Sequence, residues 1–135
     1  MRRQNEQLTE MKTWDEVCIV DDAQIPRMVT QRMCENYFKG TPIRVFENVD
    51  LALAYFHKDE NKKRIIFLDL HMPDKDGWSF LDSYHPSEKE KIYVLSSSGV
   101  EDEINRANKY SSVDKFISKP ITQDKLYNLF GELTY

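Results

Sequence analysis

The stretch that decides the fold is residues 65–77, which read Ile65-Ile66-Phe67-Leu68-Asp69-Leu70-His71-Met72-Pro73-Asp74-Lys75-Asp76-Gly77. Its first four residues are all apolar, which is typical of a strand buried on both faces of a parallel sheet. The run ends on the carboxylate of Asp69, and the Pro and Asp-Gly that follow predict a turn. A desolvated, unpaired carboxylate is costly. We therefore expect Asp69 at the solvent-facing strand end, near a cation, where open α/β sheets bind ligands.

The same strand-then-helix pattern repeats along the whole chain. Short apolar segments predict strands at 17–20, 42–46, 65–68, 92–95 and 113–118. Apolar residues at helical spacing predict helices around 25–33, 49–56, 78–84, 100–107 and 126–133. Five such alternations with short connections require parallel strands, with crossover helices on both faces of the sheet. The prediction is an α/β three-layer sandwich around a five-stranded parallel sheet, with the more alternating strand 42–46 near an edge.

Some local features carry their own expectations. In the first helix Ile25, Met28, Val29 and Met33 form a stripe typical of an amphipathic helix, which Gly40 is expected to end. The charged run 58–64 is expected to be a solvated helix end and loop. In the last helix a glycine at position 131 is expected to be a local weak point.

Length and composition exclude several classes of protein. A chain of 135 residues with 40% hydrophobic and 31% charged residues suits one soluble globular domain, taken as residues 14–135 after a polar tail or short helix at 1–13. A net charge of −4 argues against a nucleic-acid-binding surface. There is neither an apolar run long enough for a membrane helix nor a signal peptide, so we expect no membrane partner and a cytoplasmic location. The two cysteines and three histidines have no metal-site spacing.

Polar side chains follow four of the five predicted strands. They are Asp21, Asp22, Asp69, Ser96 (or a neighbouring serine) and Lys119. If the strands are parallel, these side chains lie at one edge of the sheet. Carboxylate oxygens suit Mg²⁺, which leaves room for phosphate oxygens, and a lysine and a hydroxyl can hold the remaining phosphoryl oxygens. The set is suited to placing a phosphoryl group on a carboxylate.

Four motifs in this order resemble a response regulator receiver domain of the chemotaxis-regulator type. They are Ile19-Val20-Asp21-Asp22, the stretch 68–77, Val94-Leu95-Ser96 and Lys119-Pro120. The resemblance runs from about Asp15 to the C-terminus. It implies a flavodoxin-like, doubly wound sheet with strand order 2-1-3-4-5. It also implies a single-domain response regulator that is phosphorylated by a sensor histidine kinase or a histidine phosphotransfer protein, in two-component or phosphorelay signal transduction.

The resemblance implies a role for each acidic residue of the set. Asp69 matches the phosphoacceptor. Asp21 and Asp22 match the acidic pair that holds Mg²⁺ (or Mn²⁺), with Asp69 as a further ligand. The backbone carbonyl of His71 would complete the protein's share of the metal shell.

The remaining motif residues match groups that respond to the phosphoryl group. Lys119 matches the lysine that pairs with the acceptor carboxylate, and its bond to the following proline is expected to be cis. Ser96 matches the hydroxyl that closes on the phosphoryl oxygen, with Ser97 left as an alternative register. Phe116 matches the aromatic switch residue, here without a phenol. His71 and Ser98 occupy positions that tune the lifetime of the phosphoryl group.

Three hypotheses about function remain open. In the first, the receiver switches a partner protein through the face formed by the helix 100–107, the strand 113–118 and the last helix; no output domain is expected to follow. The alternative is a receiver-like interaction module that takes no phosphate. The third, a small enzyme, is disfavoured because glycines are sparse and His71 stands where a phosphatase would want a second acid. We therefore expect no activity beyond self-phosphorylation and autodephosphorylation.

Overall fold

The structure, a computed structural model, describes residues 14–131 as five strands alternating with five helices. The strands are β1 (Glu16–Val20), β2 (Ile43–Phe46), β3 (Arg64–Asp69), β4 (Glu90–Ser96) and β5 (Val113–Ser118). The helices are α2 (Gln24–Tyr37), α3 (Val49–Lys58), α4 (Gly77–Ser83), α5 (Glu101–Asn108) and α6 (Gln123–Phe130). All strand pairs are parallel, in the order β2-β1-β3-β4-β5. The predicted fold class and strand order are confirmed; the segment 1–13 lies outside the described residues.

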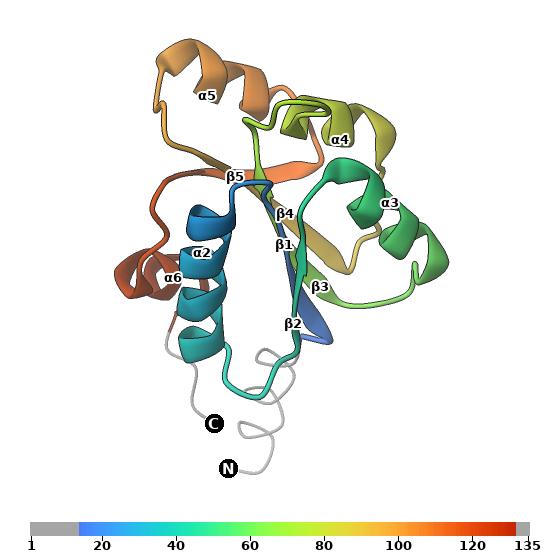
Figure 1. Cartoon of the computed structure of the whole chain (residues 1–135), viewed down its shortest axis with the longest axis vertical. Coiled ribbons are helices and arrows are strands. Elements are labelled where there is room, and N and C mark those ends of the chain that lie inside the picture. Colours follow the sequence, from blue (N-terminus) through green and yellow to red (C-terminus); the bar gives the residue numbers. More distant parts are fainter. Residues whose placement is uncertain (1–13, 132–135) are drawn as a thin grey trace.

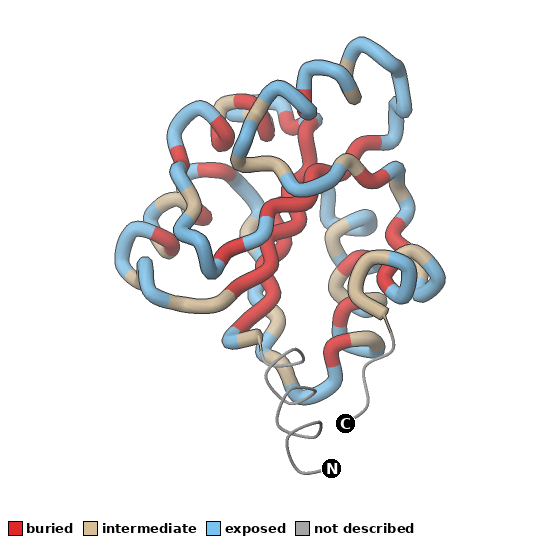
Figure 2. Tube along the Cα trace, turned by 180° about the vertical axis from the view of Figure 1, so that it is seen from behind, coloured by how far each residue is buried: buried red, intermediate tan, exposed pale blue. Residues whose placement is uncertain are grey.

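The helices form two layers around the sheet (Figure 1). Helices α2 and α6 cover one face, and α3, α4 and α5 cover the other. Alternate strand residues supply the two cores: Ile66 and Leu68 pack on the α3–α4 side, whereas Ile65 and Phe67 pack on the α2–α6 side. Every residue of β1 and β3 is buried, and the central strands are accordingly red in Figure 2. This burial on both faces explains the continuous apolar runs, and β2 lies at an edge as predicted.

The helix ends differ from the predictions at two glycines. Helix α2 ends at Tyr37, so Gly40 lies in the turn beyond it, with a φ of 84°. Gly131 follows the last residue of α6 with a φ of 78°, so it caps that helix and does not weaken its interior. The predicted continuation of α6 to residue 133 passes beyond the described range.

Most of the apolar stripe of α2 does not face the core. Ile25 is 74% exposed, Met28 55% and Val29 39%. The residues of α2 that are fully buried are Thr30 and Cys34, whose small side chains let the helix lie close to the sheet. The helix itself was predicted correctly, but Ile25, Met28 and Val29 of its stripe face solvent, whereas Met33 packs at the edge of the α2–α6 core.

The expectation that the charged run 58–64 is solvated is wrong at its last residue. Arg64 opens β3 and is 0% exposed. Its register partners are Glu16 on β1 and Glu90 on β4. The guanidinium lies 2.9 Å from Glu16 and 2.8 Å from Glu90. Because three strands start side by side, a charge that looked solvated in the sequence is neutralised inside the molecule.

Candidate functional site

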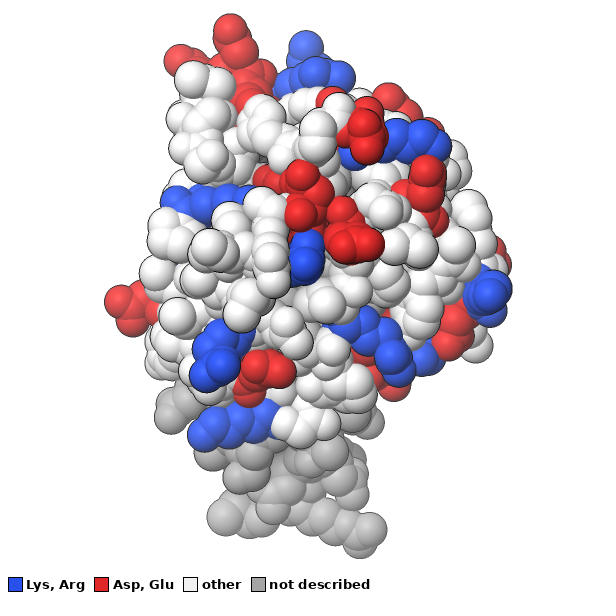
Figure 3. Space-filling view, in the orientation of Figure 1, with Lys and Arg blue, Asp and Glu red and all other residues white. Residues whose placement is uncertain are grey.

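Three carboxylates meet at the carboxyl ends of β1 and β3. Asp21 and Asp22 directly follow β1, and Asp69 is the last residue of β3. One oxygen from each lies within 4.8 Å of the others. Asp21 and Asp69 are buried, whereas Asp22 is partly exposed. In the space-filling view acidic side chains gather at this end of the molecule (Figure 3).

Lys119 bridges two of these carboxylates. It follows β5, and its Nζ lies 2.9 Å from Asp21 Oδ2 and 3.2 Å from Asp69 Oδ1. The two carboxylates raise the pKa of Lys119 although burial alone would lower it. Its backbone N–H donates to the carbonyl of Ser96, and its bond to Pro120 is cis, as predicted. The pairing with Asp21, closer than that with Asp69, was not predicted.

The acceptor candidate Asp69 has an unfavourable environment for its charge. Burial, and then the neighbouring Asp21, raise its pKa to about 6. Lys119 and the His71 backbone N–H, 3.4 Å from Oδ1, act in the opposite direction. Asp69 is thus mainly ionised at neutral pH, but at a cost that a second cation would reduce. Three carboxylates with one side open to solvent fit Mg²⁺ or Mn²⁺. The part played by the His71 carbonyl stays a prediction.

Gly77 brings two backbone segments together under this site. A Cβ at this position would lie 2.6 Å from the Asp69 carbonyl oxygen and 2.8 Å from the Leu70 Cα. The Gly77 N–H donates to the Leu70 carbonyl over 3.1 Å. The sequence predicted a turn here but not this close approach, which any other residue would disrupt.

Burial separates the serines at the end of β4. Ser96 is 0% exposed, whereas Ser97 and Ser98 are exposed. Ser96 and Ser98 share one side of the strand, and their Oγ atoms lie 3.1 Å apart. Phe116 on β5 lies opposite Val94 on β4. Its side chain is partly buried against the α3–α4 core.

Two residues near the site were not identified from the sequence. Arg27 on α2 donates to the backbone carbonyls of Asp21 and Asp22, at 2.9 and 3.3 Å. Glu103 in the first turn of α5 accepts hydrogen bonds from His71 and Ser98. Burial tends to raise the pKa of Glu103, but its hydrogen bonds with Ser96, His71 and Ser98 outweigh this and lower it. An acid in a first helical turn is common for dipole reasons alone, so the sequence offered little signal.

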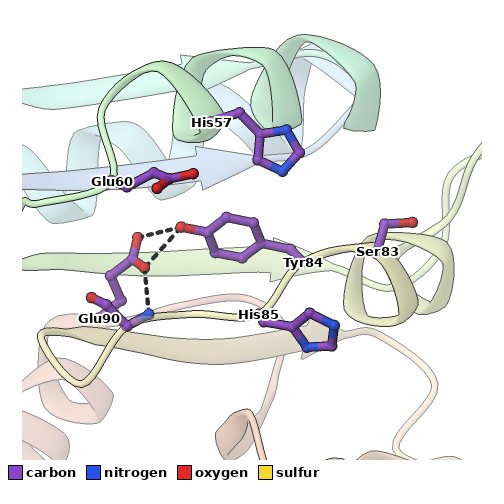
Figure 4. A pocket seen from close by; sticks show the side chains of 7 residues that line it. His57, Glu60, Ser83, Tyr84, His85 and Glu90 are labelled. Atoms are coloured by element: carbon purple, nitrogen blue, oxygen red, sulfur yellow. Dashed lines mark hydrogen bonds between the residues drawn. The ribbon is translucent and has the colours of Figure 1, made fainter.

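A second hollow lies at the opposite end of the sheet (Figure 4). It is lined by His57, Glu60, Ser83, Tyr84, His85, Ser87 and Glu90. The Glu90 carboxylate is turned toward the Tyr84 hydroxyl, at 2.7 and 2.8 Å, and accepts the Ser87 N–H. Since Arg64 also neutralises Glu90, the carboxylate in this hollow has its partners within the fold.

The described residues contain no helix that is both long and apolar enough to cross a membrane.

Comparison with known proteins gives one consistent result. Residues 17–130 match the family described as the response regulator receiver domain. The KDP operon transcriptional regulatory protein KdpE of Escherichia coli is 31% identical over 105 residues, which are 77% of this chain and 44% of that protein. The two-component response regulator ARR2 of Arabidopsis thaliana is 25% identical over 84% of this chain and 17% of its own length. The chain thus spans less than half the length of these curated relatives.

A solved structure, that of a two component response regulator from Cytophaga hutchinsonii, superimposes with a TM-score of 0.76 at 24% identity. The superposition covers 87% of this chain and 95% of that one. At this identity the likeness concerns the fold.

Proposed function

The chain belongs to the response regulator receiver family, and from this we propose that it accepts a phosphoryl group from a phosphohistidine onto Asp69 in a phosphorelay. The observation that carries the proposal is the position of Asp69. It lies at the end of a buried strand, paired with Lys119 and within reach of two further carboxylates. A lone structural aspartate would need neither the lysine nor the acidic pair.

The chemistry follows from these neighbours. An oxygen of Asp69 attacks phosphorus, the phosphorus–nitrogen bond of the donor breaks, and the electron pair returns to the imidazole, which takes up a proton. Lys119 lies beside the attacking carboxylate and offsets negative charge that develops in transfer. The buried hydroxyl of Ser96 is available to donate to a phosphoryl oxygen. Mg²⁺ held by Asp21, Asp22 and Asp69 would neutralise further charge on the phosphoryl oxygens.

A small phosphodonor tests this proposal directly. Incubation with acetyl phosphate and Mg²⁺ should add the mass of one phosphoryl group to the intact protein, and chelation of the metal should prevent it. Asp69→Asn should not acquire the added mass, whereas Asp74→Asn, an exposed acid of the following loop, should behave like the wild type. Equal labelling of Asp69→Asn would refute the assignment.

The exposed stripe of α2 is our choice for the surface that receives the phosphodonor protein. The residues that line a shallow, mainly apolar hollow on this surface are Ile25, Met28, Val29, Arg32 and Met33. Helix α2 begins just after the acidic pair, so a protein seated on the stripe lies beside the acceptor site. Apolar side chains exposed together indicate a protein contact more readily than scattered ones.

Negative charge introduced into this stripe should slow phosphotransfer from a protein donor but not from a small-molecule donor. In Ile25→Asp/Met28→Asp, transfer from a kinase or phosphotransfer protein that labels the wild type should slow about tenfold, equivalent to about 1.4 kcal/mol of lost binding. Labelling by acetyl phosphate should be unchanged, because the site is intact. Asn36→Asp, exposed near the other end of the helix, is the control. Unchanged transfer in the double variant would show that donors dock elsewhere.

For the surface that contacts a downstream partner protein we propose the face formed by α5, β5 and α6, where Val100 and Tyr127 are more than half exposed and Phe116 is partly buried.

We also propose that the protein turns over no external substrate, which an assay on a generic phosphate ester checks. An interaction module that takes no phosphate remains the alternative. A wild-type protein that neither gains a phosphoryl group nor changes its Trp78 fluorescence with Mg²⁺ would favour it.

A further inference from the structure

One carboxylate joins the two loops that border the acceptor. Glu103 lies in the first turn of α5, and its side chain is only 12% exposed. It contacts His71 Nε2 at 3.0 Å through Oε1 and at 2.9 Å through Oε2. Its Oε1 also accepts the Ser98 hydroxyl over 3.0 Å. His71 belongs to the loop after β3 and Ser98 to the loop after β4, so Glu103 ties both loops to one helix.

These contacts determine where the proton of the Ser96 hydroxyl points. A serine hydroxyl has a single proton to donate, and an ionised carboxylate can only accept. The Ser98 proton is directed to Glu103. The hydrogen bond between the Ser96 and Ser98 Oγ atoms, at 3.1 Å, then uses the proton of Ser96, and the Glu103 carboxylate, which also interacts with Ser96, attracts that proton in the same direction. The Ser98 backbone N–H completes the arrangement by donating to Ser96 Oγ over 3.1 Å.

A phosphoryl group on Asp69 would need that same Ser96 proton. We propose that Glu103 is a positioning residue that holds the Ser96 hydroxyl, through Ser98, in the unphosphorylated arrangement, and that this chain must open before Ser96 can bind the phosphoryl group. The inference rests on the proposed phosphorylation of Asp69 and adds a regulatory contact to it. Glu103 thereby disfavours the phosphorylated state, because its contact with Ser98 competes for the Ser96 hydrogen bond that the phosphoryl group needs.

Removal of the carboxylate should therefore favour the modified state. Glu103→Ala should bind the phosphoryl mimic beryllofluoride, with Mg²⁺, about fivefold more tightly, the change expected from the net free energy of one hydrogen bond. Asp102→Ala is the matched control, because it removes the same charge from an exposed position of the same helical turn. Tryptophan fluorescence titration measures both affinities, and Glu103→Gln, which keeps the size of the side chain, replaces Glu103→Ala if the latter does not fold.

Because glutamine has nearly the same shape as glutamate, Glu103→Gln tests the charge alone, and its affinity for beryllofluoride should rise in the same direction. A double-mutant cycle with Ser98→Ala then separates positioning from a general effect on the fold. If Glu103 acts through Ser98, the double variant gains nothing beyond the larger single effect. A merely structural role would change the melting temperature and leave the affinity of Glu103→Ala equal to that of Asp102→Ala.

Three outcomes overturn the inference: equal affinity in the two alanine variants, weaker binding in Glu103→Ala, or fully additive effects in the cycle. Each of them leaves the phosphorylation of wild-type Asp69 intact. Failure of the proposed function is a separate result, in which the wild type itself neither binds beryllofluoride nor gains a phosphoryl group.

Discussion

At the scale of single residues, the site around Asp69 holds opposing charges in a small buried space. Asp69 is only 4% exposed and lies beside both Lys119 and Asp21. The lysine supplies one positive charge for two carboxylates, so negative charge remains in excess. This residual repulsion accounts for the raised pKa of Asp69 and for the suitability of the site for a divalent cation.

The raised pKa predicts how stability depends on pH in metal-free protein. The pKa of Asp69 is about 6 in the folded protein and about 4 in an unfolded chain. Between these values the folded state keeps a proton that the unfolded state has lost, so the contribution of Asp69 to stability should fall as the pH rises from about 4 to about 6. Asp69→Asn removes this loss and should be more stable at pH 7, by at most about 3 kcal/mol. The advantage should vanish below pH 4.

Urea denaturation in EDTA at several pH values measures this difference. Lys119 keeps its contact with Asp21 in Asp69→Asn, so the variant leaves no buried ammonium unpaired. Asp74→Asn, in the exposed loop, should follow the wild-type curve. A constant difference between Asp69→Asn and the wild type from pH 4 to pH 7 would contradict the prediction.

At the scale of elements, the two ends of the central strands have different charge arrangements. At their starting ends, one arginine on β3 is neutralised by glutamates on β1 and β4. At their carboxyl ends, carboxylates outnumber the lysine. In the first arrangement Arg44 and Lys62 also pair with Glu16, so the acids are fully neutralised, whereas the second keeps an excess of acid and one partly exposed carboxylate. The second arrangement is therefore the one suited to a cation.

Replacement of Arg64 should test the closed end. Arg64→Leu leaves Glu16 and Glu90 buried without their shared partner, and such losses cost about 3–5 kcal/mol of the free energy of unfolding. Lys62→Leu removes a more exposed partner of the same Glu16 and should have little effect. Chemical denaturation compares the two variants. Similar stabilities would mean that the other donors to Glu16, Arg44 and Tyr55, compensate for Arg64.

At the scale of the whole molecule, the site depends on the sheet. The acids come from β1 and β3, the hydroxyl from β4 and the lysine from the end of β5. These residues lie as far as 98 positions apart in the chain, as for Lys119 and Asp21. A ligand at this edge therefore binds the folded state and not the unfolded one.

Mg²⁺ should accordingly raise the melting temperature of the protein. At a concentration ten times its dissociation constant, a ligand of the folded state adds about 1.4 kcal/mol of stability. Thermal denaturation with Mg²⁺ and with EDTA measures the shift. Asp22→Asn should lose most of it, because this acid contributes an oxygen to the cluster. An equal shift in wild type and Asp22→Asn would place the metal elsewhere.

Local sequence patterns were enough to predict the architecture and the members of the acidic set. Continuous apolar runs specify buried parallel strands, and the polar residues that follow four of the five runs identify the edge where the site forms. Both signals are local, because strand burial and turn chemistry are written in neighbouring residues. The order of the strands in the sheet, 2-1-3-4-5, then followed from the family resemblance.

Only the tertiary structure decided the contacts between distant segments. The α2 stripe looked like a core face, but the sheet accepts the smaller side chains of Thr30 and Cys34 instead. Arg64 looked solvated until β1 and β4 supplied its partners. The link from Glu103 to His71 and Ser98 depends on the approach of two loops. Such pairings depend on how whole elements pack, which no local pattern in the chain encodes.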